Sequence, residues 1–342
     1  MTKERMPAQP QDYQRMMQMV TGFWVTQTVR AAAVYNLADH LAAGADTPEA
    51  IAEAESTDSD STRRLLRACA SLGLMTSEDG HHFTGTSLLS TLREDDPRSL
   101  RYFAMSQSAP GHWLSWGKFP EAVRTGQHQV PAAHAEANIF DYFAKNLQEA
   151  SFFTQSMANL STAEAVDIAA VLDTANTTFA LDVGGASGDL VRAMMTANPE
   201  LNGGVFDLPH IVPDAEEAAK ADGLEGRFRA VGGNFFESVP PADLYVLKYI
   251  MHDWEDVSCV RILENCRTSL VNGGRIAVVD LLVGEIGQPG LAPLMDMNML
   301  AMTGGRERDI AEFDALFAKA GLRRVKVSTA GAFAIIEAQP TV

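Results

Sequence analysis

The sequence has few cysteines and no long apolar run, and each shortage excludes a class of protein. Three cysteines in 342 residues are too few for a disulfide framework, and no pair of them has the spacing of a metal site. No segment approaches the roughly 18 to 20 apolar residues of a membrane-spanning helix, and the N-terminus lacks an apolar run of signal-peptide length. We therefore expect a cytoplasmic protein without a membrane anchor.

Basic side chains are also scarce relative to acidic ones. The chain has 27 Lys and Arg against 44 Asp and Glu, which gives a formal charge of -17. Such a charge repels the phosphates of nucleic acids and the headgroups of anionic lipids, so neither is an expected partner. The hydrophobic fraction of 46% is ordinary for a globular protein, and the length suggests about two domains.

The first 110 residues have the pattern of a small, mainly helical domain. Apolar residues recur at helical spacing between residues 12 and 40, and two shorter helical segments follow, opened by Thr47-Pro48 and by the run that starts at Ser59. Alternation around Asp79-Gly80 then predicts a tight two-stranded hairpin. The order helix, helix, hairpin is typical of a winged helix.

This domain is a poor candidate for reading DNA. Residues 1–110 carry 10 Lys and Arg against 14 Asp and Glu, a net charge of -4, whereas a DNA-binding domain should be basic. The apolar stripe of Met16, Val20, Phe23 and Trp24 instead exceeds what a small domain can bury alone. We expect a homodimer formed through these helices.

The pattern changes after about Phe179, where apolar β segments begin to alternate with helical segments, and we expect the second domain to begin near residue 165. Such alternation predicts a parallel sheet with crossover helices, the doubly wound α/β class. The expected domains are therefore 1–110, a helical linker at 111–164, and 165–342. The expected strands cover residues 178–183, 203–208, 242–250 and 274–282.

A glycine-rich turn follows the first of these strands. Gly184 and Gly185 are adjacent and the next glycine is Gly188, so the dinucleotide pattern Gly-x-Gly-x-x-Gly is out of register and NAD is only the second choice. Asp-x-Gly-x-x-x-Gly, starting at Asp182, resembles the first motif of class I methyltransferases. In those enzymes the loop faces the methionine part of S-adenosylmethionine.

Further motifs make the resemblance specific. They are LDVGGASGD, GVFDLPHIV, GGNFF, LKYIMHDWEDVSCVRILENC, GGRIAVVD and GGRERD, in family order and at near-family spacing. The chain resembles the S-adenosylmethionine-dependent O-methyltransferases of the plant caffeic-acid type and of bacterial natural-product pathways, such as phenazine or anthracycline methyltransferases. The resemblance implies a winged-helix-like dimerisation domain before a class I catalytic domain, no metal, and methyl transfer to a hydroxyl of a small aromatic acceptor.

The resemblance also assigns the positions that bind the cofactor. Asp207 would accept hydrogen bonds from both ribose hydroxyls, and its alternative role is to cap a helix. Asn234 stands where the family usually has Asp, which removes a charge but keeps an acceptor for the adenine amino group. The other positions are Met157 and Ser161, Gly184 and Gly185 at the methionine part, and Leu208. Phe235 would lie beside the adenine, Lys248 near the adenine, and Tyr249 stacked on its ring.

His252 is the candidate general base. A phenol with a pKa near 10 needs a base poised close to neutrality, and His252 follows the strand at 242–250, at the edge of the sheet where ligands bind. Asp280 and Glu307 lie 28 and 55 residues further on (280 - 252 and 307 - 252), and such carboxylates hold the imidazole Nδ1–H. Many family members have Glu at position 280, so which carboxylate orients the ring stays open.

Four further residues are assigned to the acceptor: Trp116, Phe153, Asp253 and Met299. Asp253 is equally suited to cap the next helix, and Met299 belongs to a methionine stripe that is typical of a core. No cluster of Asp, Glu and His has metal-ligand spacing. The alternatives are methylation of a nitrogen or carboxyl group, a cofactor-sensing DNA-binding regulator, and a family member repurposed to non-methylating chemistry.

Overall fold

The computed structural model describes residues 8–341 and contains two compact units. The first comprises residues 8–110 and 148–156, and the second comprises residues 111–147 and 157–341. The boundaries expected from the sequence, after residues 110 and 164, stay predictions. Among the described residues, no helix is both long and apolar enough to cross a membrane.

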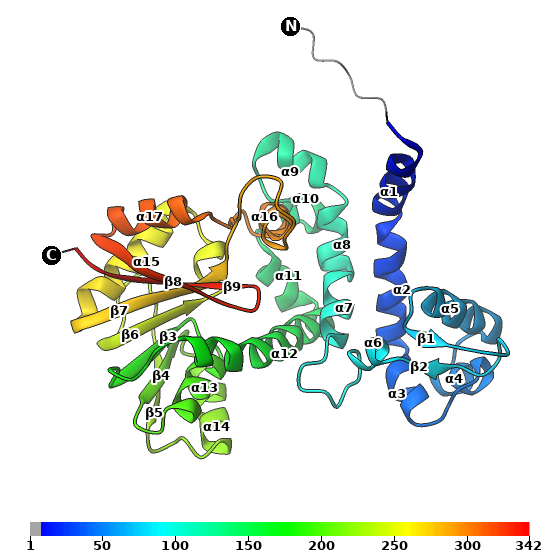
Figure 1. The fold of residues 1–342 in the computed structure, drawn as a ribbon, viewed down its shortest axis with the longest axis horizontal. Coiled ribbons are helices and arrows are strands. Elements are labelled where there is room, and N and C mark those ends of the chain that lie inside the picture. The colour runs from blue at the N-terminus through cyan, green and yellow to red at the C-terminus, as the bar shows by residue number, and fades with distance from the viewer. Residues whose placement is uncertain (1–7, 342) are drawn as a thin grey trace, which may run out of the picture. The chain divides into compact units, whose positions relative to one another are not determined.

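The N-terminal unit is mainly helical, as its sequence pattern predicts (Figure 1). The Thr47 hydroxyl caps its helix by accepting from the N–H of Ala50, and Asp58 caps the next helix by accepting from Ser61. The helices are α1 (Pro10–Val20), α2 (Gly22–Val34), α3 (Leu37–Ala42), α4 (Pro48–Glu55), α5 (Ser59–Ser71), α6 (Ser87–Ser90) and α7 (Arg101–Gln107).

The hairpin of this unit differs from the sequence expectation. β1 (Met75–Thr76) and β2 (Thr84–Gly85) pair in antiparallel fashion, so the hairpin is present. The loop between the strands covers residues 77–83, however, so the prediction that the turn is tight is wrong. The reason is Asp79, whose Oδ1 accepts from the backbone N–H groups of His81 and His82, both at 2.8 Å. These bonds close a local turn inside the loop rather than between the strands.

The second unit contains a seven-stranded sheet in the order β5-β4-β3-β6-β7-β9-β8 (Figure 1). The strands are β3 (Phe179–Val183), β4 (Asn202–Asp207), β5 (Phe228–Gly232), β6 (Ala242–Lys248), β7 (Leu270–Leu281), β8 (Leu322–Ala330) and β9 (Phe333–Pro340). The pairs from β5 to β7 are parallel, which confirms the doubly wound class. β9 runs antiparallel to β7 and β8, and the two C-terminal strands, β8 and β9, were not predicted from the sequence.

Helices cover the sheet and connect its strands. The helix α12 (Leu147–Val171) has residues in both units. Four helices precede the sheet in the chain: α8 (Pro110–Trp116), α9 (Phe119–Thr125), α10 (Val130–His134) and α11 (Ile139–Lys145). The helices that connect its strands are α13 (Asp189–Ala197), α14 (Val212–Ala221), the short 3₁₀ turn η1 (Met251–Asp253), α15 (Asp256–Ser269), α16 (Ala292–Met302) and α17 (Ile310–Lys319).

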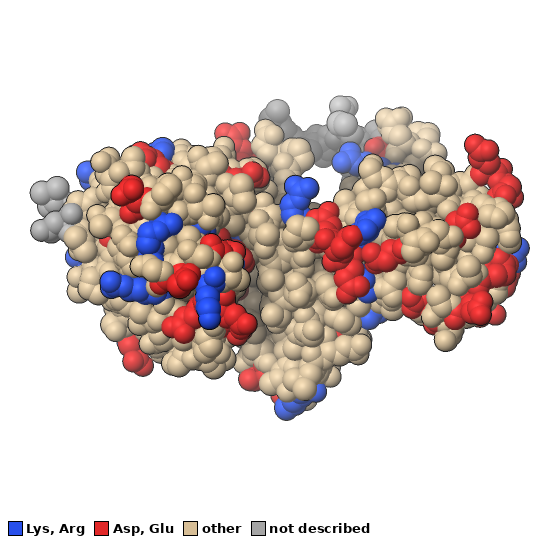
Figure 2. All heavy atoms as spheres, turned by 90° about the horizontal axis from the view of Figure 1, so that it is seen from below, with Lys and Arg blue, Asp and Glu red and all other residues tan. Residues whose placement is uncertain are grey.

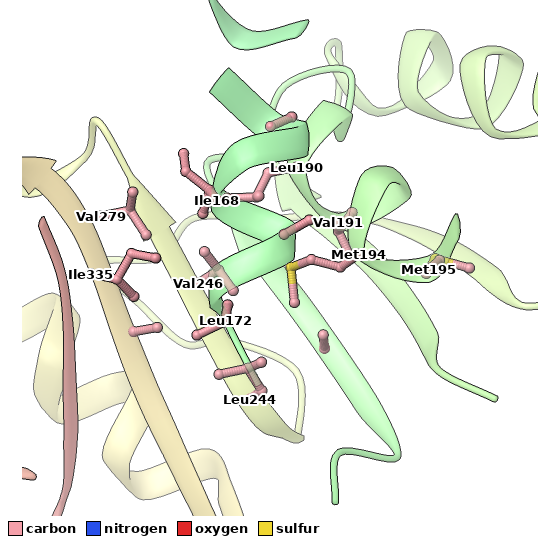
Figure 3. Packing of buried hydrophobic residues seen from close by; sticks show 14 of the residues in the cluster. Ile168, Leu172, Leu190, Val191, Met194, Met195, Leu244, Val246, Val279 and Ile335 are labelled. Carbon is pink, nitrogen blue, oxygen red and sulfur yellow. The ribbon is translucent and has the colours of Figure 1, made fainter. Parts of the chain in front are cut away.

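A buried apolar cluster fixes the helices beside the central strands. Ile168 of α12 and Leu190 of α13 pack with Val246 of β6, Val279 of β7 and Ile335 of β9 (Figure 3). Each such side chain is 1% exposed or less, and its burial stabilises the unit by roughly 1.5–3 kcal/mol. The cluster thereby holds the start of α13 at the carboxyl end of β3, where the glycine turn lies.

The surface charge agrees with the composition. On the face shown in Figure 2, Asp and Glu side chains are interspersed with Lys and Arg, and no broad basic area forms there.

Candidate active site

The turn between β3 and α13 requires glycine at two positions. Gly184 and Gly188 have φ of 73° and 76°, in the left-handed region that side chains rarely adopt. A Cβ at Gly184 would overlap Ile250, and one at Gly188 would lie 2.7 Å from Val205 Cγ2. A Cβ at Gly185 would lie 2.7 Å from Asp182 Oδ2. Neighbouring side chains therefore leave room only for backbone at these three positions, and we call this turn the backbone cradle.

Asp207 ends β4 beside this turn. Its Oδ2 accepts from the N–H of Ala186 at 2.9 Å, and its Oδ1 accepts from the N–H of Leu208 at 2.6 Å. Each carboxylate oxygen keeps a further lone pair, so the group can still accept from two ribose hydroxyls. The alternative role as a helix cap is wrong, because α14 begins only at Val212 and is preceded by Ile211.

Lys248 ends β6 and is anchored to α12. Its Nζ lies 2.8 Å from Glu164 Oε2 and donates to Ser161 Oγ at 3.2 Å. Lys248 and Ser161 were expected at the cofactor, and the structure brings them together. Glu164 was not among the expected residues, although it lies one helical turn after Ser161 on the same face. Burial raises the pKa of Glu164, and the ammonium of Lys248 opposes that change.

The other expected cofactor residues are placed as follows. Phe235 lies against the turn, 3.7 Å from where a Cβ of Gly184 would be. Asn234 is exposed, and its Oδ1 accepts from the N–H of Phe236. Met157 is half-buried on α12, and Leu208 is exposed. The cradle, the free acceptor sites of Asp207 and the buried ammonium of Lys248 together fit S-adenosylmethionine.

His252 lies on the turn η1 and is 8% exposed. Its Nδ1 is 2.8 Å from Glu307 Oε1, and its Nε2 is 3.7 Å from Asp253 Oδ1. The ring of Tyr249, expected at the adenine, stacks on the imidazole with centroids 5.1 Å apart and an interplanar angle of 26°. The adenine contact of Tyr249 stays a prediction.

Asp280 lies one residue before the end of β7 and is 1% exposed, yet neither of its carboxylate oxygens has a hydrogen-bond partner in the described part of the chain. Burial raises the pKa of Asp280 to about 7, against the opposing charge of His252. Glu307 therefore contacts the imidazole directly, whereas Asp280 influences it through charge.

The proton affinity of His252 reflects opposing effects. Burial lowers its pKa, but the hydrogen bond to Glu307 and the charges of Asp280 and Asp253 together outweigh burial and raise the pKa to about 9. The free protein therefore carries a mostly protonated imidazole at neutral pH, and the neutral form increases as the pH rises.

The expected acceptor residues are only partly brought together. Trp116 Nε1 donates to Asn298 Oδ1 at 2.9 Å, which joins it to α16 next to Met299. Met299 is 7% exposed, so the interpretation as a core residue stays open. Phe153 is half-buried on the part of α12 that belongs to the first unit.

Asp253 does not cap the following helix. That helix, α15, begins at Asp256 and follows Glu255, so the capping interpretation of Asp253 is wrong. Burial raises the pKa of the Asp253 carboxyl group. Its contact with a second group of the acceptor stays a prediction.

Two further observations bear on the site. Residues 8–341 contain no group of three His, Cys, Asp or Glu side chains arranged to hold a metal ion. Arg308, which is 1% exposed and directly follows Glu307, was also not among the expected residues. No sequence signal distinguishes a buried arginine in GGRERD from an exposed one.

Comparisons with known proteins agree on one family. The family model of an O-methyltransferase domain matches residues 116–323, and that of an O-methyltransferase dimerisation domain matches residues 17–94. A phenazine O-methyltransferase of Lysobacter antibioticus is 31% identical over 327 residues, covering 95% of each chain. A 2,7-dihydroxy-5-methyl-1-naphthoate 7-O-methyltransferase of Streptomyces carzinostaticus is 37% identical over 297 residues, covering 86% of this chain and 88% of the other.

A solved structure shows the same fold over nearly the whole chain. The N,N-8-amino-8-demethyl-D-riboflavin dimethyltransferase of Streptomyces davawensis has a TM-score of 0.82 and 29% identity, and the match covers 96% of this chain and 99% of the other. None of these three relatives is named as a DNA-binding regulator.

Proposed function

Because the chain belongs to the S-adenosylmethionine-dependent O-methyltransferases, we propose that it methylates a hydroxyl of a planar aromatic natural product with His252 as the general base. The observation that carries this proposal is the 2.8 Å contact between His252 Nδ1 and Glu307 Oε1. A carboxylate at Nδ1 favours the tautomer with its proton on that nitrogen. Nε2 is then the atom that can take a proton.

The location of these groups supports the proposal. Gly184 directly follows β3, Asp207 ends β4 and Lys248 ends β6. Because these strands are parallel, the three residues lie at the same carboxyl edge of the sheet. His252 follows β6 at the same edge, which is where doubly wound folds bind ligands. A cofactor held by the first three residues therefore lies on the same side of the sheet as the base.

The chemistry follows from these positions. When bound, S-adenosylmethionine would supply an electrophilic methyl group and leave as S-adenosylhomocysteine once the methyl carbon–sulfur bond breaks. His252 Nε2 takes the hydroxyl proton as the acceptor oxygen bonds to that methyl carbon, and Glu307 stabilises the resulting imidazolium. Asp207 would hold the ribose, and the anchored Lys248 would lie near the adenine. No metal takes part in this scheme.

The acceptor class is proposed from the relatives. The phenazine and dihydroxynaphthoate enzymes are named for fused planar rings. We assign Trp116, Phe153, Asp253 and Met299 to such an acceptor, since a thioether makes favourable, adaptable contacts with a flat ring.

We also propose a cytoplasmic homodimer. The dimerisation-domain match includes Val20, Phe23 and Trp24, and these side chains are 62%, 50% and 62% exposed. Three large apolar side chains exposed on neighbouring turns mark an interaction surface.

One specific observation favours a second candidate, methylation of an aromatic amine. The structurally similar riboflavin-type enzyme is named as an N,N-dimethyltransferase. An amine has a lone pair without prior proton removal, so it would depend less on His252 than a phenol does.

The test is an acceptor panel. The protein is incubated with methyl-labelled S-adenosylmethionine and with hydroxyphenazines, dihydroxynaphthoic acids and their amino analogues, and the products are analysed by mass spectrometry. We expect O-methylated products. Products methylated only on nitrogen would favour the second candidate, and no product from either set would reject the acceptor class.

A further inference from the structure

The turn that carries His252 is held by three successive residues of one segment. The N–H of Arg306 donates to the carbonyl of His252 at 2.8 Å, and Glu307 contacts the imidazole. Arg308 Nη1 donates to the carbonyl of Met251 at 2.8 Å, and Nη2 donates to the carbonyl of Trp254 at 2.8 Å. Arg308 thus binds the backbone on both sides of His252.

The Arg308 guanidinium is fully buried, and its charge is balanced within this arrangement. Nη2 lies 2.9 Å from Asp256 Oδ1 and Nε lies 3.2 Å from the same oxygen, so each of the three nitrogens donates to at least one partner. The hydrogen bond from Arg308 lowers the pKa of Asp256. A planar fork can reach two carbonyls and a carboxylate at once, which a lysine ammonium cannot do with the same geometry.

Two neighbours show how closely the segment and the turn fit. A Cβ at Gly305 would overlap the carbonyl of His252, so the segment passes directly against the turn. Cys259 Sγ lies 3.2 Å from the carbonyl of Met251 and 3.4 Å from that of Trp254, the same acceptors that Arg308 uses. Burial raises the pKa of Cys259 to about 11, so its thiol remains a donor at neutral pH.

We propose that Arg308 is a positioning residue of the methyl transfer, which fixes the turn Met251–Asp253 so that the His252 imidazole stays against Glu307 and aimed at the acceptor. This role rests on the proposed function of His252 as the base. Arg308 touches neither acceptor nor cofactor in this account and acts only through the backbone of the turn.

The variant Arg308→Lys tests the role because it keeps the charge but loses the fork. Arg227→Lys is the matched control, since Arg227 also donates to two backbone carbonyls, those of Leu201 and Met195, away from His252. Both variants should lose thermal stability. Only Arg308→Lys should alter the titration midpoint of the His252 imidazole and the turnover number.

The decisive readout is a pH titration of ¹⁵N-histidine-labelled protein by NMR, which needs no acceptor. The His252 signals are assigned by their absence in His252→Gln. Besides Glu307, the charged groups that face the ring are Asp280 and Asp253, and both variants retain them. In Arg308→Lys we expect the His252 midpoint to fall by about half a pH unit or more, because a loosened turn weakens the bond to Glu307. On the acceptor found in the panel, kcat should fall about tenfold or more with unchanged cofactor affinity.

An unchanged His252 titration in folded Arg308→Lys would overturn the proposal. If Arg308→Lys does not fold, Asp256→Asn is used instead, because this substitution removes the carboxylate that orients the Arg308 guanidinium. An unchanged titration midpoint of His252 in Asp256→Asn would likewise overturn the proposal. The proposed base is tested separately by turnover of His252→Gln. Full activity of His252→Gln would reject the base, whereas loss of activity there with an unaffected Arg308→Lys would reject only the role of Arg308.

Discussion

At the scale of single residues, the site concentrates negative charge around one imidazole. Glu307, Asp280 and Asp253 all favour the protonated ring and outweigh the effect of burial. The proposed general base must be neutral to accept a proton, so in the proposed mechanism this environment sets the pH range of activity. In that mechanism the same carboxylates stabilise the imidazolium that forms when the proton is transferred.

We therefore expect kcat/KM to rise with pH up to about 9, since this parameter reports ionisation in the free enzyme and the pKa of His252 is raised to about 9. In Glu307→Gln the pKa of His252 should fall, because the hydrogen bond that raises this pKa is lost while burial of the imidazole still lowers it. The midpoint of the pH profile should then move to lower pH, with a reduced plateau. Glu285→Gln, on an exposed loop, serves as the control. An unmoved midpoint in Glu307→Gln would remove Glu307 from the account.

Asp207 permits an equally specific test on the cofactor side. Asp207→Ala should weaken binding of S-adenosylmethionine about tenfold or more with little effect on the acceptor, because charge-assisted hydrogen bonds to ribose are lost. Calorimetry measures this affinity, and Asp214→Ala, an exposed acid in the first turn of α14, is the control. Equal affinities in the two variants would show that Asp207 serves only the backbone bonds to Ala186 and Leu208.

At the scale of elements, the sequence predicted those parts of the fold that have a strong local pattern. The apolar runs of β3, β4, β6 and β7 were recognisable because strands buried on both faces are continuously hydrophobic. β5 was missed because the run Phe228–Gly232 is short and lies at the sheet edge, where only Phe228 is buried. The antiparallel β8 and β9 were missed because one hairpin at the end of a chain does not repeat the alternation of strand and helix.

The residues of the candidate site could be proposed from the sequence, but their contacts could not. Spacing and family resemblance pointed to His252, Asp280 and Glu307, yet only the structure places Glu307 rather than Asp280 against Nδ1. Arg308 and Glu164 were missed because only tertiary packing brings them to the turn and to Lys248. Local sequence carries no signal for such pairings.

The glycine turn supplies a prediction at this scale. Gly184→Ala should destabilise the protein by about 0.5–1.5 kcal/mol more than Gly223→Ala, because both have positive φ but only the Cβ at Gly184 would push the end of a side chain, that of Ile250, away from its rotamer. It should also weaken binding of S-adenosylmethionine. Denaturant unfolding and calorimetry measure the two effects. Matching values for both variants would mean that the turn tolerates a side chain and does not form the cradle.

At the scale of the whole molecule, the apolar helices α1 and α2 should determine the oligomeric state. Trp24→Asp should convert a dimer to a monomer at micromolar concentration, because it places a charge in the proposed interface. Sedimentation measures the mass, and Val257→Asp, at an exposed position on α15, is the control. If the unaltered protein sediments as a monomer with full activity, the homodimer is rejected.

The most direct test of the whole account is the turnover of His252→Gln on a phenolic acceptor. We expect normal binding of S-adenosylmethionine, since Gly184, Asp207 and Lys248 remain in place. Methyl transfer at neutral pH should be about a hundredfold to ten-thousandfold slower, the range for loss of a general base. Raising the pH should restore part of the rate, because a phenol that ionises in solution no longer needs a base. Near-normal turnover of His252→Gln at neutral pH would contradict the mechanism, since the acceptor would then react already ionised or by proximity alone.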